Sequence, residues 1–196
     1  MSILGILLTI PILFLAFSAN AGLSSEAERV QKSYAKLVSS PNDPATQLAY
    51  LEAFPQTHDE FMTVFMPPDF KQLYDGHEYV YALRDIGTAF PEKTIELLLR
   101  IVATARWNAD AVNYLQNVTL GIAFSNPQLF VRCLIALAKR EQDGVVRFLA
   151  DGIEGPKPSF LELADRIEEV GQALLAKRMR EEAQISKERA DHEHGR

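Results

Sequence analysis

The sequence predicts an all-α protein, and two patterns support this fold class. Apolar residues recur with i, i+3, i+4 spacing along most of the chain, which is the pattern of one buried helix face. No segment has the sustained alternation of apolar and polar residues, bounded by glycine-rich turns, that is typical of half-buried β-strands. The chain has 196 residues, of which 47% are hydrophobic and 23% charged, enough for one globular core.

The first segment, residues 1–21, is predicted to be a secretory signal peptide. An uncharged apolar run from Ile3 to Phe17 precedes the small residues Ala19 and Ala21. The run is shorter than the roughly 20 apolar residues that a membrane anchor needs. We therefore expect cleavage before Gly22 and export to the periplasm or the medium. A single all-α domain over residues 22–175 is expected to follow.

The starts of several helices are well marked. Asp43 is expected to cap a helix that has Pro44 in its first turn. Thr57 and Glu60 fit a capping box, in which each side chain bonds the backbone of the other residue. A later helix is expected to follow Gly76. Its buried stripe should contain Tyr79, Leu83, Ile86 and Phe90, which follow a 4, 3, 4 spacing.

The only tryptophan lies in the segment RWNADAVNYL, residues 106–115, which also has the composition of a helix start. Asn108 is the expected N-cap, and Trp107 and Val112 the expected hydrophobic staple. A binding site is the alternative interpretation. A narrow polar stripe on this helix contains Asp110, Asn113 and Asn117, which either pair inside the fold or line a groove.

A weak repeat suggests how the helices are arranged. Ala-Phe junctions that lead to a proline recur at Phe54, Phe90 and Phe124, at spacings of 36 and 34 residues. This spacing suits a repeating helical hairpin. We expect an irregular, solenoid-like stack of antiparallel helical hairpins, with a closed helical bundle as the alternative. Residues 91–105 and 109–124 are apolar around most of their circumference and should lie in the middle of the core.

The C-terminal segment, residues 176–196, is rich in charge. Ile185 is its only large aliphatic residue after Met179. We expect an extended C-terminal helix that is solvated beyond the core and frays into a tail.

The net charge of −6 is unevenly distributed along the chain. Residues 22–90 contain ten acidic and five basic residues, whereas residues 91–196 contain sixteen acidic and fifteen basic ones. The acidic first half argues against nucleic acid or an anionic membrane surface as the partner. A protein with a basic surface is a better match.

Few residues suggest catalysis. His77 lies between Asp75 and Glu78, and a carboxylate beside a histidine can orient it for acid–base chemistry. The local sequence is HEYVY rather than HExxH, so the second helical zinc ligand is missing. The simpler interpretation is a helix entrance with acidic residues at the positive end of the dipole. The lone Cys133 is expected to be a small apolar helix residue. We expect no catalytic residues, no metal site and no cofactor.

The sequence therefore predicts an exported, non-enzymatic helical protein that binds a protein partner. A periplasmic immunity or inhibitor protein is one concrete case. A periplasmic helical-repeat scaffold or assembly factor is the alternative, and an enzyme built on Asp75, His77 and Glu78 is a third hypothesis. Exposed tyrosine beside carboxylates is typical of interfaces with basic partners. The predicted partner-binding residues are Asp75, His77, Glu78, Tyr81 and Asp85.

Overall fold

The computed structural model describes residues 23–108, 110–152 and 155–194, and the predicted signal peptide over 1–21 lies outside this part of the chain. The described residues form ten α-helices and no β-strand, which confirms the all-α prediction. The helices are α1 (Ser25–Ser39), α2 (Pro44–Ala53), α3 (His58–Phe65), α4 (His77–Ala89), α5 (Pro91–Val102), α6 (Ala111–Ser125), α7 (Pro127–Ile135), α8 (Lys139–Ala150), α9 (Pro158–Glu169) and α10 (Ala173–His194).

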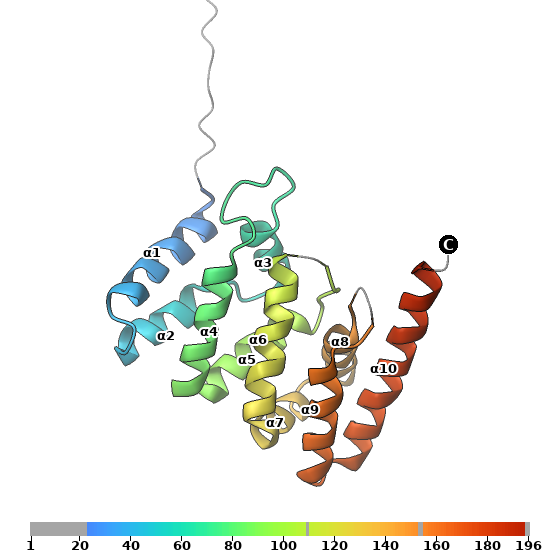
Figure 1. Cartoon of the computed structure of the whole chain (residues 1–196). Coiled ribbons are helices and arrows are strands. Elements are labelled where there is room, and N and C mark those ends of the chain that lie inside the picture. Colours follow the sequence, from blue (N-terminus) through green and yellow to red (C-terminus); the bar gives the residue numbers. More distant parts are fainter. Residues whose placement is uncertain (1–22, 109, 153–154, 195–196) are drawn as a thin grey trace, which may run out of the picture.

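The chain progresses across the molecule from α1 at one end to α10 at the other (Figure 1). α1 packs on α2, α4 on α5 and α6, and α9 on α10. Two of the predicted junctions are tight helix-to-helix turns. Phe90 is at once the C-cap of α4 and the residue before α5, and Asn126 has the same position between α6 and α7. The distinction between a solenoid-like stack and a closed bundle stays a prediction.

Two of the expected helix starts have the expected chemistry. The Asp43 carboxylate accepts hydrogen bonds from the backbone amides of Ala45 and Thr46, which have no partner inside the helix. The Thr57 hydroxyl accepts from the amide of Glu60 at 3.2 Å. The Glu60 carboxylate bonds the amide of Gln56, one residue before the position that the capping box requires. Local side chains therefore set where α2 and α3 begin.

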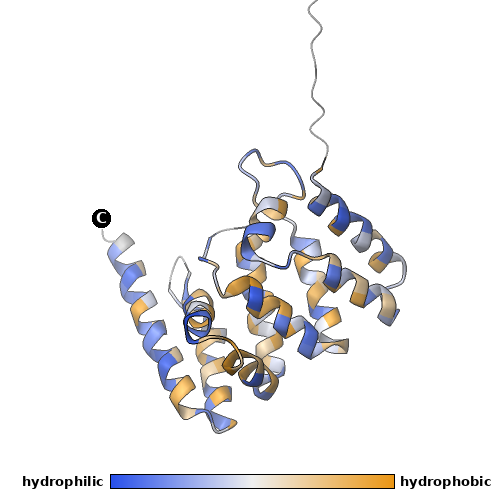
Figure 2. Cartoon of the chain, turned by 180° about the vertical axis from the view of Figure 1, so that it is seen from behind, coloured by the Kyte–Doolittle hydropathy of each residue, from blue (hydrophilic) through white to orange (hydrophobic). Residues whose placement is uncertain are grey.

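The middle of the molecule is its most apolar part. α5 and α6 bury residues around most of their circumference, as their composition predicts. The first and last helices, α1 and α10, are mostly hydrophilic, and orange hydrophobic segments dominate between them (Figure 2). The helices in the middle are covered on several sides, so few of their positions can be polar.

α10 differs from the expectation of a wholly solvated segment. One face is buried against α8 and α9. The buried residues are Ala176, Met179, Ala183, Ser186 and Ala190, which follow a 3, 4, 3, 4 spacing. These side chains are mostly small, so the helix backbones can approach closely. A prediction based on the spacing of large aliphatic residues does not detect a buried stripe of this kind. The outward face of α10 is charged, as predicted.

The predicted start of α6 is wrong. Asp110, and not Asn108, is the N-cap residue, and its φ of 54° and ψ of −127° are unusual for a residue with a side chain. The Asp110 carboxylate caps no helix amide but accepts a hydrogen bond from the Tyr74 hydroxyl at 2.5 Å. Because the helix begins at Ala111, Trp107 does not occupy the N′ position and the predicted staple with Val112 is not formed. A long-range contact thus overrides the local capping signal.

No described helix is both long and apolar enough to cross a bilayer alone; α6 and α7 reach that length and composition only as a pair, which bends by 112°.

Candidate functional site

A loop between α3 and α4, residues 66–76, positions several of the predicted site residues. The amides of Leu73 and Asp75 donate to carbonyls at the C-terminal end of α3, at 3.2 and 3.1 Å. Three of its residues with side chains have positive φ: Phe70 (54°), Gln72 (63°) and Asp75 (69°). A conformation of this kind costs roughly 1 kcal/mol or more per residue, so the surrounding contacts must hold the loop.

Gly76 ends this loop and is required by its surroundings. Its φ is +51°, and a Cβ atom built there would lie 2.2 Å from the ring of Phe65. The backbone can therefore turn into α4 directly against a buried ring only because the residue is glycine. The turn leaves His77 and Glu78 in the first turn of α4.

The three predicted acid–base residues come together at this point. The Nδ1 atom of His77 lies 3.6 Å from an Asp75 carboxylate oxygen and 3.3 Å from a Glu78 carboxylate oxygen. The side chains remain open to solvent, with exposed fractions of 57% for His77, 38% for Asp75 and 45% for Glu78. The imidazole therefore lies beside two carboxylates, and water reaches all three groups.

Aromatic residues from α6 and from the loop extend this cluster. The ring of Tyr114 lies edge-on to His77, with centroids 6.1 Å apart, and 5.3 Å from the ring of Tyr81. The hydrogen bond to Asp110 raises the pKa of Tyr74. The pKa of Tyr114 is also raised, first by partial burial and then by the nearby Asp75. Both phenols therefore stay neutral donors near neutral pH.

We call these residues together the acidic tyrosine surface. It comprises Tyr74, Asp75, His77, Glu78, Tyr81, Asp85, Asp110 and Tyr114. Asp75, His77 and Glu78 touch one another, and Tyr81 joins them through Tyr114. Asp85 is exposed, one helical turn beyond Tyr81 on α4. The side chain of Arg84 stacks over the Tyr81 ring at 4.3 Å, so one ring of this surface already holds a guanidinium.

Sequence reasoning missed Tyr74, Tyr114 and the role of Asp110 in this surface. Asp110 and Tyr114 lie one helical turn apart in the tryptophan-containing segment, for which a helix start is the main interpretation and a binding site the alternative. That spacing was the available signal, because residues four apart share a helix face. The contact with Tyr74, 36 positions earlier in the chain, has no local signature.

The two asparagines of the polar stripe pair inside the fold. The Lys157 ammonium donates to the side-chain oxygens of Asn113 at 2.7 Å and of Asn117 at 2.5 Å. Partial burial lowers the pKa of Lys157, and both of these acceptors are neutral amides. The bridge ties the segment before α9 to α6. Asn117 also lines a cleft of about 500 Å³ between α4 and α6, where Gly121 leaves open space.

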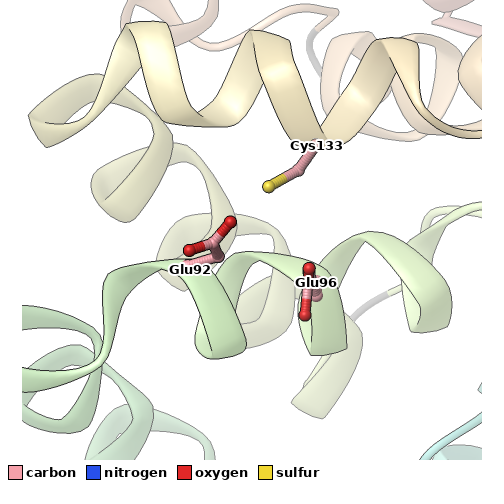
Figure 3. A group of neighbouring side chains, drawn as sticks. All are labelled: Glu92, Glu96 and Cys133. Carbon is pink, nitrogen blue, oxygen red and sulfur yellow. The ribbon is translucent and has the colours of Figure 1, made fainter.

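Glu92, Glu96 and Cys133 form a second group of potential ligands (Figure 3). The glutamates lie one turn apart on α5, Cys133 faces them from α7, and their ligand atoms lie within 4.8 Å of one another. Arg132 binds Glu92 at 2.7 Å and already supplies a cation there. Burial, and then Glu96 and Glu92, raise the pKa of the Cys133 thiol, which disfavours the thiolate that binds metals. The buried position agrees with Cys133 as a small apolar helix residue.

The chain matches no protein-family model, no curated protein and no solved structure. The arrangement of the residues is therefore the basis for assigning a function. The acidic tyrosine surface combines solvent-accessible carboxylates with the phenol oxygens and aromatic faces of its tyrosines. Carboxylates and phenol oxygens accept hydrogen bonds from guanidinium or ammonium ions, and aromatic faces attract these cations.

Proposed function

We propose that this protein acts by binding, without catalysis, and that it docks a basic segment of a protein partner on the acidic tyrosine surface. The observation that carries the proposal is the convergence of three carboxylates and three tyrosines from the loop, α4 and the start of α6, with the exposed Asp85 one helical turn beyond Tyr81. Tyrosine is enriched among residues that dominate binding energy, because its ring buries a large area with few rotatable bonds.

The charge of the chain supports a basic partner. The acidic surface lies in a chain with a net charge of −6, so its field attracts cations over distances beyond direct contact. The stacking of Arg84 on Tyr81 supports the same chemistry within the protein itself. A partner's arginine or lysine would find further rings at Tyr74 and Tyr114. An acidic protein that covers a basic surface is suited to act as an inhibitor, and we propose a toxin-blocking immunity protein as the particular case to test.

The backbone around the surface also supports a role beyond stability. Asp75 and Asp110 both have positive φ, and each contributes a carboxylate to the surface. Residues held in costly backbone conformations cluster at functional sites. We infer that the loop is held in this form because the binding surface needs it.

Acid–base catalysis by Asp75, His77 and Glu78 is a weaker proposal. The three groups are neighbours, but the distances of 3.6 and 3.3 Å are longer than the roughly 2.6–3.2 Å that direct proton transfer requires. In addition, His77 is more than half exposed, and general acid–base catalysis gains most where water is excluded from the reacting groups. A surface-exposed histidine is better suited to hydrogen bonding with a partner.

The scaffold or assembly-factor hypothesis has one observation in its favour. The cleft of about 500 Å³ between α4 and α6 has Arg84, Thr88, Asn117 and Ser125 on its walls, which together supply hydrogen-bond donors and acceptors for a peptide. A tryptophan in place of Gly121 would fill the cleft, whose lining contains no residue of the acidic tyrosine surface, although Arg84 on its wall stacks on Tyr81. Loss of a partner in that variant alone would favour the scaffold function.

Export remains part of the proposal. We propose that residues 1–21 are removed and that the binding takes place outside the cytoplasm. Determining the N-terminal residue of the protein purified from its source cells tests this directly. Gly22 as the first residue is the expected result, and a retained Met1 would contradict it.

The binding proposal is tested by affinity capture with the chain beginning at Gly22, followed by titration of the captured partner. Tyr81→Ala should weaken the complex by about 30-fold, the effect of losing one dominant contact. Asp85→Lys should weaken it by several-fold, and more at low salt than at high salt.

Glu162→Lys, an equal charge change at an exposed position of α9, is the matched control and should leave binding unchanged. Circular dichroism of each variant reports whether the helices remain folded. If both Tyr81→Ala and Asp85→Lys bind the partner as tightly as the unchanged protein, the acidic tyrosine surface is not the interface.

A further inference from the structure

A hollow of about 350 Å³ lies between the segment after α5, the C-terminal end of α8 and the outer part of α10. α8 and α10 run side by side in this part of the molecule (Figure 1). The walls are formed by Ala105, Arg106, Trp107, Arg147, Phe148, Asp151 and Arg189. We call this hollow the arginine pocket. It shares no residue with the acidic tyrosine surface.

The arginine pocket carries excess positive charge in a protein that is acidic as a whole. Of its three arginines, Arg189 is paired, with Asp151 at 3.6 Å and with Glu182 at 3.3 Å. Arg106 and Arg147 form no ion pair with any residue that the structure describes, and both are exposed. Two guanidinium groups therefore remain free to bind an anion, and a guanidinium can bind a carboxylate or phosphate through two parallel hydrogen bonds.

The tryptophan supplies a second, independent observation. The indole Nε1 of Trp107 is buried and has no hydrogen-bond acceptor among the described residues. Indole is only a donor, and a buried donor without an acceptor costs roughly 1–3 kcal/mol. Buried polar groups are rarely left in this state. Other atoms cover Nε1 in this structure, so a bound molecule supplies the missing acceptor only if the indole ring turns toward the pocket that Trp107 lines.

The shape and lining of the pocket indicate more than an inorganic ion. Trp107 is partly exposed and adds apolar surface beside the arginines, whereas Phe148 and Ala105 are buried and present almost none. Sites of this size typically combine apolar walls with a few polar groups that fix the orientation of the ligand. An organic molecule can place its anionic group on Arg106 and Arg147 and its apolar body against the ring of Trp107.

We propose that the arginine pocket binds a small organic oxyanion, one that carries a carboxylate or phosphate group on an apolar body. Arg106 and Arg147 hold the anionic group. With the ring turned toward the pocket, the indole N–H of Trp107 donates to one of its oxygens, and the Arg189–Asp151 pair closes one side of the pocket. The site is separate from the proposed partner-binding surface and does not depend on it.

Trp107 is the only tryptophan in the chain, so its fluorescence reports on this pocket alone. Three probes are titrated: inorganic phosphate, phenyl phosphate and benzoate, with sodium chloride at matched ionic strength as the reference. We expect saturable fluorescence changes, with phenyl phosphate or benzoate binding at least tenfold more tightly than inorganic phosphate. The comparison of phenyl phosphate with benzoate identifies which anionic group the arginines prefer.

The variants Arg106→Gln and Arg147→Gln should each weaken binding roughly tenfold or more, the loss expected for one charge-assisted contact. Arg140→Gln, on the same helix as Arg147 but outside the pocket, is the control and should bind like the unchanged protein. Trp107→Phe keeps a ring and removes the donor, and calorimetry should show weaker binding. Fluorescence that changes no more than in sodium chloride would overturn the proposal. So would unchanged affinity in both arginine variants, or affinities for phenyl phosphate and benzoate that are both no higher than the affinity for inorganic phosphate.

Discussion

The two ends of the molecule are held together by different interactions. In α1 to α4, side chains from four helices form a continuous series of aromatic ring contacts with centroids 4.5 to 6.2 Å apart. Its members are Tyr34, Tyr50, Phe54, Phe61, Phe65 and Tyr79. At the other end, arginines of α10 pair with carboxylates on α8, on α9 and in the segment after α8. These pairs are Arg178 with Asp143, Arg180 with Asp165 and Glu168, and Arg189 with Asp151.

The difference has an energetic consequence. A fully buried aromatic ring contributes several kcal/mol through apolar area and ring contacts, whereas an exposed ion pair contributes about 0.2–1 kcal/mol. Each ring of the aromatic end therefore contributes more stability than each ion pair at the other end. There the buried apolar face of α10 supplies most of the stability, and the ion pairs mainly define the register between neighbouring helices. The two proposed binding sites, the acidic tyrosine surface and the arginine pocket, have opposite charges.

The largest expected effect is the loss of a ring from the aromatic end. Phe61 is fully buried and lies 5.0 Å from Phe65 and 6.2 Å from Phe54, measured between ring centroids. Phe61→Ala should lower the free energy of unfolding by about 3–5 kcal/mol, measured by urea denaturation with circular dichroism.

Leu174→Ala is the control, because Leu174 on α10 is 86% exposed, and it should change stability by less than about 0.5 kcal/mol. A loss below about 1 kcal/mol for Phe61→Ala would show that the aromatic contacts do not dominate that end.

A smaller effect is expected where α8 meets the end of α5. A Cβ atom at Gly144 would lie 1.9 Å from the carbonyl oxygen of Ala103, so the two backbones must separate. Gly144→Ala should destabilise the protein by about 1–3 kcal/mol.

Gly121→Ala is the matched variant, because nothing lies within 4 Å of its Cβ position, and it should be neutral or stabilising by up to about 1 kcal/mol. If both variants behaved alike, close backbone packing would not be what holds α8 in place.

The smallest effect is expected for a single ion pair. Arg180 lies 2.7 Å from Asp165 and 2.6 Å from Glu168, and all three side chains are solvent-exposed to a large extent. Arg180→Gln should cost about 0.2–1 kcal/mol at low salt, and the difference from the unchanged protein should nearly vanish in about 1 M sodium chloride. A cost that persists at high salt would mean that the arginine stem, and not its charge, stabilises the contact.

Sequence reasoning located the helices well where their signals are local. Asp43 caps α2 as predicted, and Pro91 and Pro158 lie at the starts of α5 and α9. It misplaced the start of α6. The N-cap is Asp110, whose carboxylate accepts a hydrogen bond from Tyr74, and not the expected Asn108. It also overlooked the buried face of α10, whose small residues have little hydrophobicity of their own.

The candidate site likewise has one part that the sequence predicts and another that only the packing of the helices creates. Asp75, His77 and Glu78 are close in sequence at a helix entrance, so their contact was predictable from spacing alone. Tyr114 and Asp110 come from a different helix, and only the packing of α6 on α4 brings them to the same surface. The arginine pocket had no sequence signal, because Arg106, Arg147 and Arg189 are separated by about forty positions each.

By itself, the sequence determined the all-α class, most helix starts and the acidic character of the first half. These features depend on composition or on interactions within about one helical turn. Both can be deduced from the order of residues alone. Tertiary structure decided which polar groups meet, where α6 begins and which face of α10 is buried. Such outcomes depend on contacts between residues tens of positions apart, whose strength appears only once the helices are packed.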